Sequence, residues 1–174
     1  QVQSGEQYLS PNLLRMYGYD DGELKPSVAE LDALVHPEDV GRLQHDRQAH
    51  LDGITLTYSN EHRVRCKDGS WKWVHSRGMV ISRDAQGRAL RMTGTHTDIT
   101  QRKRDEEARY VLEAEKQKTL EHIRSVEKEL NFGHPLPLPD EIGRSAKYQE
   151  RIQTLRDEKR RLQDDVSSLE RELA

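Results

Sequence analysis

The sequence predicts an α+β domain followed by two long, charged helices, and two observations carry this prediction. Up to residue 100, turn signals such as Lys67-Asp68-Gly69 and Asp84-Ala85-Gln86-Gly87 separate stretches that alternate like strands. From residue 101 to residue 130 the chain has no Gly or Pro and is rich in strong helix formers. We therefore expect a domain at 1–100, a helix at 101–130, a Pro-rich linker at 131–144 and a coiled-coil helix at 145–174.

The composition excludes several classes of protein. Charged residues make up 34% of the 174 positions and hydrophobic residues 33%, with a net charge of -3. This charge gives no reason to expect nucleic acid as a partner. No run approaches the roughly 18 apolar residues that a membrane-spanning helix needs, and the single cysteine, Cys66, excludes an internal disulfide. We expect a cytoplasmic protein with no direct membrane span in this sequence.

Three helices are expected in the first domain. Ser10-Pro11 is typical of a helix start, because Ser caps the first turn and Pro fits into it. Gly18 marks the end of this helix. A second, short helix is expected at 28–35. Pro37 opens a third helix, with acidic residues in its first turn, and Asp52-Gly53 ends it.

Alternating residues predict three longer strands at 56–66, 71–81 and 89–99, and a short strand at 6–9. Lys67-Asp68-Gly69-Ser70 is typical of the hairpin turn between the first two of the longer strands. Neither face of this sheet is cleanly polar, so we expect both faces to be covered. The helices are expected on one face and a different partner on the other.

Several motifs in the first domain occur in a characteristic order. They are Tyr8-Leu9-Ser10-Pro11, Tyr17-Gly18-Tyr19, His36-Pro37-Glu38-Asp39, Glu61-His62-Arg63-Val64-Arg65, Lys67-Asp68-Gly69-Ser70, Trp73 and Gly94-Thr95-His96-Thr97-Asp98-Ile99-Thr100. Together they resemble a PAS domain of the subgroup with a PAC motif, over about residues 1–100. The resemblance implies a five-stranded antiparallel sheet with helices on one face. Only residues 1–3 precede the first turn, so we expect a truncated first strand and a fragment of a longer protein.

The resemblance also implies a ligand pocket between the sheet and the helices. Alignment with the flavin-binding PAS group places six residues inside: His62, Val64, Val74, Ser76, Met92 and His96. His96 falls where that group has a glutamine that touches flavin. The photoreactive Asn-Cys-Arg-Phe segment of the group is absent, so light-driven adduct chemistry is not expected. A buried histidine needs a hydrogen-bond partner, which is either Ser76 or the backbone, or a ligand.

Haem is the second cofactor that the resemblance suggests. Some haem-binding PAS domains hold iron through a histidine on the helix that corresponds to residues 37–51. His45 lies near that place, with His50 close by, although its spacing to Gly53 is shorter than in the haem group. A neutral imidazole is a good iron ligand. We expect no bound cofactor, with haem and flavin as the alternatives.

The other sheet face and the end of the last strand are expected to carry the signal. Arg63, Trp71, Trp73 and His75 share the outer face and are too large and apolar to be left wet, so a second subunit or a flanking helix is expected to cover them. Asp98-Ile99-Thr100 resembles the family's junction to an output helix. Thr100 can cap that helix, and Asp98 can pair with a basic neighbour.

The two long helices each carry a narrow apolar seam. The first seam contains Leu112, Ile123, Val126 and Leu130, with Lys116 and Thr119 between them. The second contains Tyr148, Ile152, Leu155, Leu162, Val166, Leu169 and Leu173, with Lys159 as its polar member. Helices with such narrow stripes must pair. The two helices fold back as a hairpin, or each pairs with its copy. We favour a parallel dimer through the first helix, in which the second helix can fold back.

No catalytic constellation is found, so we predict a protein that is not an enzyme. The chain lacks a Gly-rich phosphate loop, a His-Glu-x-x-His pair and a Gly-x-Ser-x-Gly elbow. His122 lies on a long helix, but the residues after it do not resemble a kinase phosphoacceptor motif. We predict a dimeric sensory module for two-component or similar signal transduction, with an output domain outside this chain such as a histidine kinase or nucleotide cyclase. The alternative is a dimerisation module without a ligand.

Overall fold

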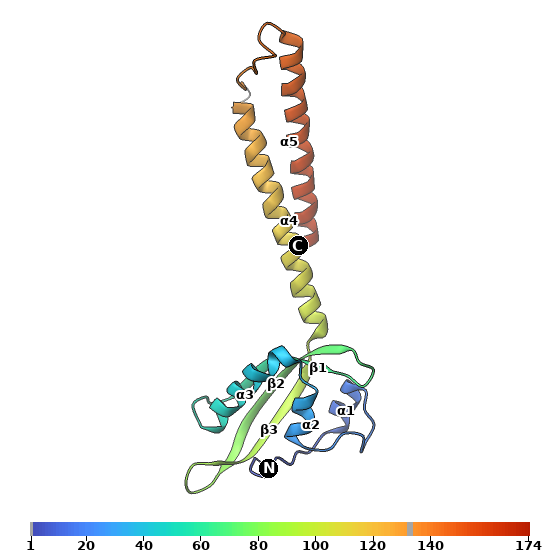
Figure 1. Cartoon of the computed structure of the whole chain (residues 1–174), viewed down its shortest axis with the longest axis vertical. Helices are drawn as coiled ribbons and strands as arrows, with labels where there is room; N and C mark the ends of the chain where they lie inside the picture. Colours follow the sequence, from blue (N-terminus) through green and yellow to red (C-terminus); the bar gives the residue numbers. More distant parts are fainter. Residues whose placement is uncertain (1, 132–133) are drawn as a thin grey trace. The chain divides into compact units, whose positions relative to one another are not determined.

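The computed structural model describes residues 2–131 and 134–174. Two compact units divide the chain after Lys103. The first unit holds three helices and three strands, and the second is formed by two long helices. The elements are α1 (Pro11–Tyr17), α2 (Val28–Ala33), α3 (Pro37–Leu51), β1 (Tyr58–Arg65), β2 (Trp71–Arg83), β3 (Ala89–Asp98), α4 (Thr100–Leu130) and α5 (Ser145–Leu173), as labelled in Figure 1.

The sheet is antiparallel in the order β1-β2-β3. Its register places Asn60, Ser76 and His96 side by side in one row across the three strands. Because side chains alternate along a strand, Trp73 and its partner Arg63 lie on the opposite face. The helices lie along the face that carries the Asn60–Ser76–His96 row (Figure 1). We call this the inner face and the opposite one the outer face.

The expectation of five strands is wrong for the part of the chain that the structure describes, where the sheet has three. The segment expected as a strand at 6–9 forms only one isolated bridge, between Glu6 and Ser27. Its neighbour Pro26 accepts a hydrogen bond from the Gln7 N–H but has no N–H of its own to continue a ladder. Before that segment, Val2 donates one hydrogen bond to Leu90 of β3. Residue 1 of the predicted first strand lies outside the described residues.

The core of the first unit forms where α1 packs on the sheet. Leu14 and Tyr17 of α1 join Val64 and Val74 of the inner face in one buried cluster, together with Leu24 and Leu34. The side chain of Ser10 accepts a hydrogen bond from the backbone N–H of Leu13 and begins α1. Gly18, with a φ of 82°, ends the helix in the left-handed conformation that favours glycine. These signals fix Tyr17 over the sheet.

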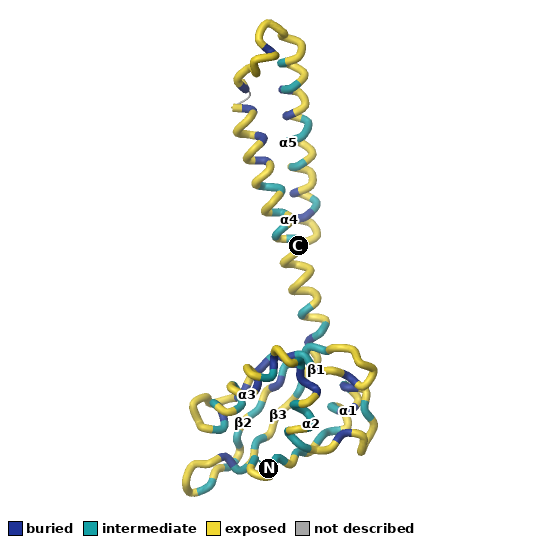
Figure 2. Tube along the Cα trace, in the orientation of Figure 1, coloured by how far each residue is buried: buried dark blue, intermediate teal, exposed yellow. Residues whose placement is uncertain are grey.

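The second unit is an antiparallel hairpin of α4 and α5. Buried residues lie on the facing sides of the two helices, as Figure 2 shows in dark blue. They are Ile123, Val126 and Leu130 of α4 with Ile152, Leu155, Val166 and Leu169 of α5. Residues 132–133 of the predicted linker lie outside the described residues. In the remainder of the linker, Pro135 is buried and its carbonyl accepts the Tyr148 hydroxyl at 2.7 Å. Among the described residues, no helix is both long and apolar enough to cross a bilayer.

Candidate functional site

Polar side chains meet between the inner face and the helices. The hydroxyl of Tyr17 on α1 lies 2.6 Å from Nδ1 of His96 on β3. On β1, His62 Nδ1 lies 3.0 Å from Asn60 Oδ1, and Asn60 Nδ2 donates to Asp46 of α3 at 2.6 Å. The rings of His62 and His96 stand edge to face, with centroids 6.3 Å apart. The Tyr17–His96 hydrogen bond and the Asp46–Asn60–His62 chain of hydrogen bonds therefore meet where the two imidazole rings face each other.

The hydrogen-bond partners assign a proton to each imidazole. Because the amide of Asn60 donates to a carboxylate, its oxygen faces His62, so His62 Nδ1 carries the proton and Nε2 is an acceptor. Tyr17 is buried and its O–H has His96 Nδ1 as its partner. His96 Nδ1 therefore accepts, and its Nε2 carries the proton. The two Nε2 atoms form a donor and acceptor pair that no hydrogen bond to a described residue uses.

The hydroxyl of Ser76 is the third free polar atom at this place. Ser76 is 2% exposed, and its Oγ finds no hydrogen-bond partner among the described residues. It stands between Asn60 and His96 in the cross-sheet row. Buried polar atoms are rarely left unpaired, because desolvation then costs about 1–3 kcal/mol. The inner face thus holds one unpaired buried hydroxyl beside two imidazoles whose Nε2 atoms bind no described residue.

Burial keeps the two imidazoles uncharged. Desolvation lowers the pKa of His62 to about 4, with a contribution from the neighbouring His96. Desolvation also lowers the pKa of His96 to about 4, and it raises the pKa of the Tyr17 hydroxyl. At neutral pH the site presents a donor, an acceptor and a hydroxyl without a positive charge. Such uncharged groups can form hydrogen bonds with a neutral polar molecule. Within the described ranges, no three His, Cys, Asp or Glu side chains are placed to hold a metal ion.

The structure brings together most of the residues expected in the pocket. His62, Val64, Val74 and Ser76 are buried on the inner face, and His96 is half-buried beside them. Met92 lies on the same face, opposite Val80, four residues along β3 from His96. The methionine is therefore farther along the sheet than the imidazole pair.

The histidines of α3 occupy different environments. The side chain of His45 is 82% exposed and lies 3.3 Å from Asp46. His50 is buried, with Nδ1 2.9 Å from the Thr55 carbonyl and Nε2 accepting the Val80 N–H at 3.0 Å. Both ring nitrogens of His50 are therefore in use, and His45 lies at the surface. Neither histidine presents a free nitrogen to the core.

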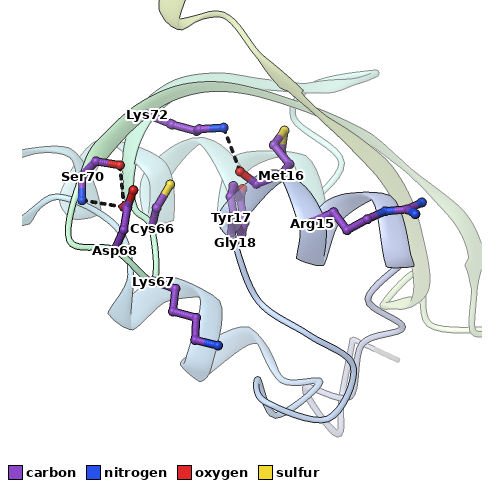
Figure 3. Close-up of a pocket in the computed structure, with 9 residues that line it drawn as sticks. All are labelled: Arg15, Met16, Tyr17, Gly18, Cys66, Lys67, Asp68, Ser70 and Lys72. Carbon is purple, nitrogen blue, oxygen red and sulfur yellow. Dashed lines mark hydrogen bonds between the residues drawn. The ribbon is translucent and has the colours of Figure 1, made fainter.

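A separate groove lies between the end of α1 and the β1–β2 turn (Figure 3). Its volume is about 310 Å³. Lys72 crosses it to donate to the Met16 carbonyl at 2.9 Å, and Lys67 pairs with Glu23. The thiol of Cys66 lies at its wall, where burial raises the pKa of the thiol. Both lysines that line the groove therefore already have partners. Their contacts hold the end of α1 against the sheet and the neighbouring loop.

The outer face is organised around Trp73. The Arg63 guanidinium lies 5.5 Å and the Lys103 ammonium 5.3 Å from the centroid of the Trp73 ring. Arg63 also binds the buried carboxylate of Asp39 at 2.9 Å. Trp71 is 42% exposed and stacks edge to face on His36. His75 accepts or donates a bond with Ser59 at 2.9 Å. All four predicted outer-face residues therefore lie on the face away from α1.

The junction from β3 to α4 is held from two strands. Ile99 N–H donates to the Trp73 carbonyl at 2.9 Å, and Trp73 N–H donates to the Thr100 hydroxyl at 3.1 Å. Asp98 accepts the Thr100 N–H at 2.9 Å and pairs with Lys72 at 3.1 Å. The first turn of α4 is therefore tied to β2.

Glu61 of β1 supplies the second attachment. Its carboxylate lies 2.8 Å from Lys103 and 2.5 Å from Arg102, both in the first turn of α4. Hydrogen bonds from Lys103 and then Arg102 lower the pKa of Glu61 to about 2. The sequence reasoning missed Glu61, together with Tyr17, Asn60 and Asp46. For Asn60 a signal existed, since alternation along the strand expected at 56–66 puts this amide on the same face as His62.

Comparison with known proteins identifies the family. A family model described as PAS fold matches residues 6–96, more than half of the chain. The chain belongs to the PAS family. No curated protein matches it.

Two solved structures illustrate the relationship. The chain is similar to a sensory box histidine kinase/response regulator from Burkholderia thailandensis, with 38% identity and a TM-score of 0.56 over 64% of this chain and 81% of that one. It also resembles the N-terminal domain of a diguanylate cyclase with PAS/PAC sensor from Marinobacter aquaeolei, with 22% identity and a TM-score of 0.51 over 58% and 91%. The second similarity concerns the fold alone.

Proposed function

We propose that this chain is a non-catalytic sensory module that registers a small neutral molecule at its inner face and relays its presence through α4. One relationship carries the proposal: the strands that hold the free polar atoms also hold the junction. Ser76 lies three residues from Trp73 on β2, and His96 lies two residues from Asp98 on β3. A displacement of either strand at the core therefore reaches the first turn of α4 within a few residues.

The relay needs two arrangements of the sheet that the ligand binds with different affinity. A ligand that pairs with Ser76 Oγ and with the Nε2 atoms of His62 and His96 favours the arrangement in which these atoms converge. The bonds from Trp73 to Ile99 and Thr100 carry that arrangement to α4. The salt bridges of Glu61 hold the same turn from β1.

An output domain and a dimer complete the proposal. The relative from Burkholderia thailandensis is a sensory box histidine kinase/response regulator, which supports a histidine kinase as the output class, with a nucleotide cyclase as the alternative. The outer face around Arg63, Trp71, Trp73 and His75 is the surface that we propose for a homodimer. A cytoplasmic location belongs to the same proposal.

The experiment compares the wild-type protein with Ser76→Ala. Purified protein is denatured in acid, and the extract is examined by mass spectrometry after its visible spectrum has been recorded for haem or flavin. We expect a small molecule in the wild-type extract and a reduced amount from Ser76→Ala, whereas Ser82→Ala on the same strand retains it. Hydrogen exchange at the Ile99 and Thr100 amides should be slower in loaded than in stripped protein.

A protein-interaction module without a ligand is the second candidate. The contacts of Arg63 and Lys103 with the Trp73 ring favour it, because aromatic residues and arginine are enriched at protein interfaces. An empty wild-type extract, together with loss of dimerisation in Trp73→Ala, would support this candidate instead of the sensor.

A further inference from the structure

Each helix of the hairpin carries a lysine within its own apolar seam. Lys116 of α4 lies between Leu112 and Ile123 in the four-and-three spacing of the seam, and Lys159 of α5 lies between Leu155 and Leu162. A lysine at such a position weakens the seam and restricts which helix can pair with it. The partners of these two lysines therefore indicate which pairing the sequence favours.

In the hairpin, both seam lysines reach a carboxylate on the facing helix. Lys116 Nζ lies 2.7 Å from Glu170, and Lys159 Nζ lies 2.7 Å from Glu127. On the linker side of the Lys159–Glu127 pair, Leu130 and Leu155 form a buried cluster with Val126, and Leu162 packs against it. The charged and apolar contacts thus agree on a single antiparallel register.

A parallel, in-register pair of identical helices would lose these matches. Two copies of α4 would place Lys116 opposite Lys116, and two copies of α5 would place Lys159 opposite Lys159. Like charges in a seam oppose pairing, which is how coiled coils exclude wrong partners. The hairpin and an α4 dimer would also use the same apolar residues of α4, which are Ile123, Val126 and Leu130.

We infer that α5 is the built-in partner of the α4 seam, and that the hairpin and a parallel α4 dimer are mutually exclusive states of this chain. The linker supports the hairpin, since Arg151 binds the carboxylate of Glu141, which is 4% exposed, at 2.7 Å. Opening the hairpin frees the α4 seam for a second copy. The inference concerns residues 104–174 and does not depend on the ligand proposed above.

Carbodiimide cross-linking of the full chain tests the pairing, because this reagent joins a lysine to a carboxylate that it already touches. A mixture of unlabelled and ¹⁵N-labelled protein is cross-linked, digested and examined by mass spectrometry. We expect Lys159–Glu127 and Lys116–Glu170 links within single-isotope peptides. The Lys67–Glu23 link of the first unit serves as the internal control. Absence of both hairpin links beside a positive control, or mixed-isotope links, would overturn the inference.

Charge reversal tests the exclusivity. Lys159→Glu places a carboxylate against Glu127 but leaves the α4 seam unchanged, so we expect loss of the Lys116–Glu170 link and about tenfold stronger self-association in sedimentation equilibrium. Glu127→Lys combined with Lys159→Glu should restore the self-association of the wild type and the Lys116–Glu170 link. Arg160→Glu, which changes the charge at a 73% exposed neighbour, is the matched control. A Lys159→Glu variant that keeps the link, or loses it without associating, contradicts the exclusivity.

Discussion

The backbone N–H of Trp73 donates to the Thr100 hydroxyl at 3.1 Å, while the Trp73 carbonyl accepts the N–H of Ile99 at 2.9 Å. One residue of a central strand thus holds two consecutive residues at the beginning of α4. Removing the Thr100 hydroxyl should break one of these two hydrogen bonds and leave the rest of the fold in place.

Thr100→Val removes the acceptor of the Trp73 N–H and keeps the side-chain shape. We expect a loss of about 1–2 kcal/mol in the free energy of unfolding, because a half-buried donor is left unpaired. Urea unfolding measures the loss, and hydrogen exchange should show a faster Trp73 amide. Thr97→Val, at an exposed position of β3, is the control. Equal Trp73 exchange in both variants would contradict the role of Thr100.

The lowered pKa of Glu61 predicts that the free energy of unfolding decreases in acid. Its pKa is lowered from 4.5 to about 2 by Lys103 and Arg102, so the folded state favours the ionised form. The resulting stabilisation is complete above about pH 4.5 and disappears as the pH falls through 2. Urea unfolding between pH 5 and pH 2 should show a shallower decline for Glu61→Gln than for the wild type. Glu107→Gln, on an exposed part of α4, should follow the wild-type curve.

The imidazole pair predicts a second pH effect. Burial lowers the pKa of His62 and of His96 from 6.5 to about 4, so between these values the unfolded chain binds protons that the folded chain does not. Stability should therefore fall as the pH decreases from 6.5 towards 4. NMR titration of the two ring signals checks the assignment. Midpoints close to 6.5 would show that the rings are not buried as described.

At Gly94 the backbones of β2 and β3 lie too close together to admit a side chain. A Cβ built on Gly94 would lie 2.4 Å from the Arg77 carbonyl oxygen, so the backbones of β2 and β3 would have to separate. We expect Gly94→Ala to destabilise the fold by about 1–3 kcal/mol. Gly41→Ala meets no atom within 4 Å and lies inside α3. This second variant should be stabilised by about 0.5–1 kcal/mol. Thermal unfolding of the two variants compares them directly.

Much of the sheet could be predicted, since strand alternation depends only on local chemistry. The period of two separates Ser76 from Trp73 without knowledge of distant contacts, and the resemblance to PAS domains indicates which of the two faces lies inside. The sequence indicates Tyr17 as part of the motif Tyr17-Gly18-Tyr19, and it does not predict the hydrogen bond of the Tyr17 hydroxyl. Its partner His96 lies 79 residues away in the chain, and no local pattern reports such a contact.

The helical region shows a different limit. The four-and-three spacing predicted that both helices must pair, but the same spacing serves parallel and antiparallel arrangements. The choice depends on where Lys116 and Lys159 find carboxylates, at Glu170 and Glu127. Those matches become visible only when the two helices are aligned in opposite directions. For the sheet, the expectation of five strands came from the family resemblance, and the segment predicted as a short strand at 6–9 forms only the single bridge Glu6–Ser27.

The unpaired hydroxyl of Ser76 also bears on how long the molecule survives in a cell. A fold that leaves such an atom without a partner is less stable than it could be, and the unfolded fraction that proteases attack rises accordingly. Any compound that binds only the folded form lowers this fraction by a factor that grows with its concentration. The abundance of the protein would then follow the supply of the compound, before any signal passes to an output domain.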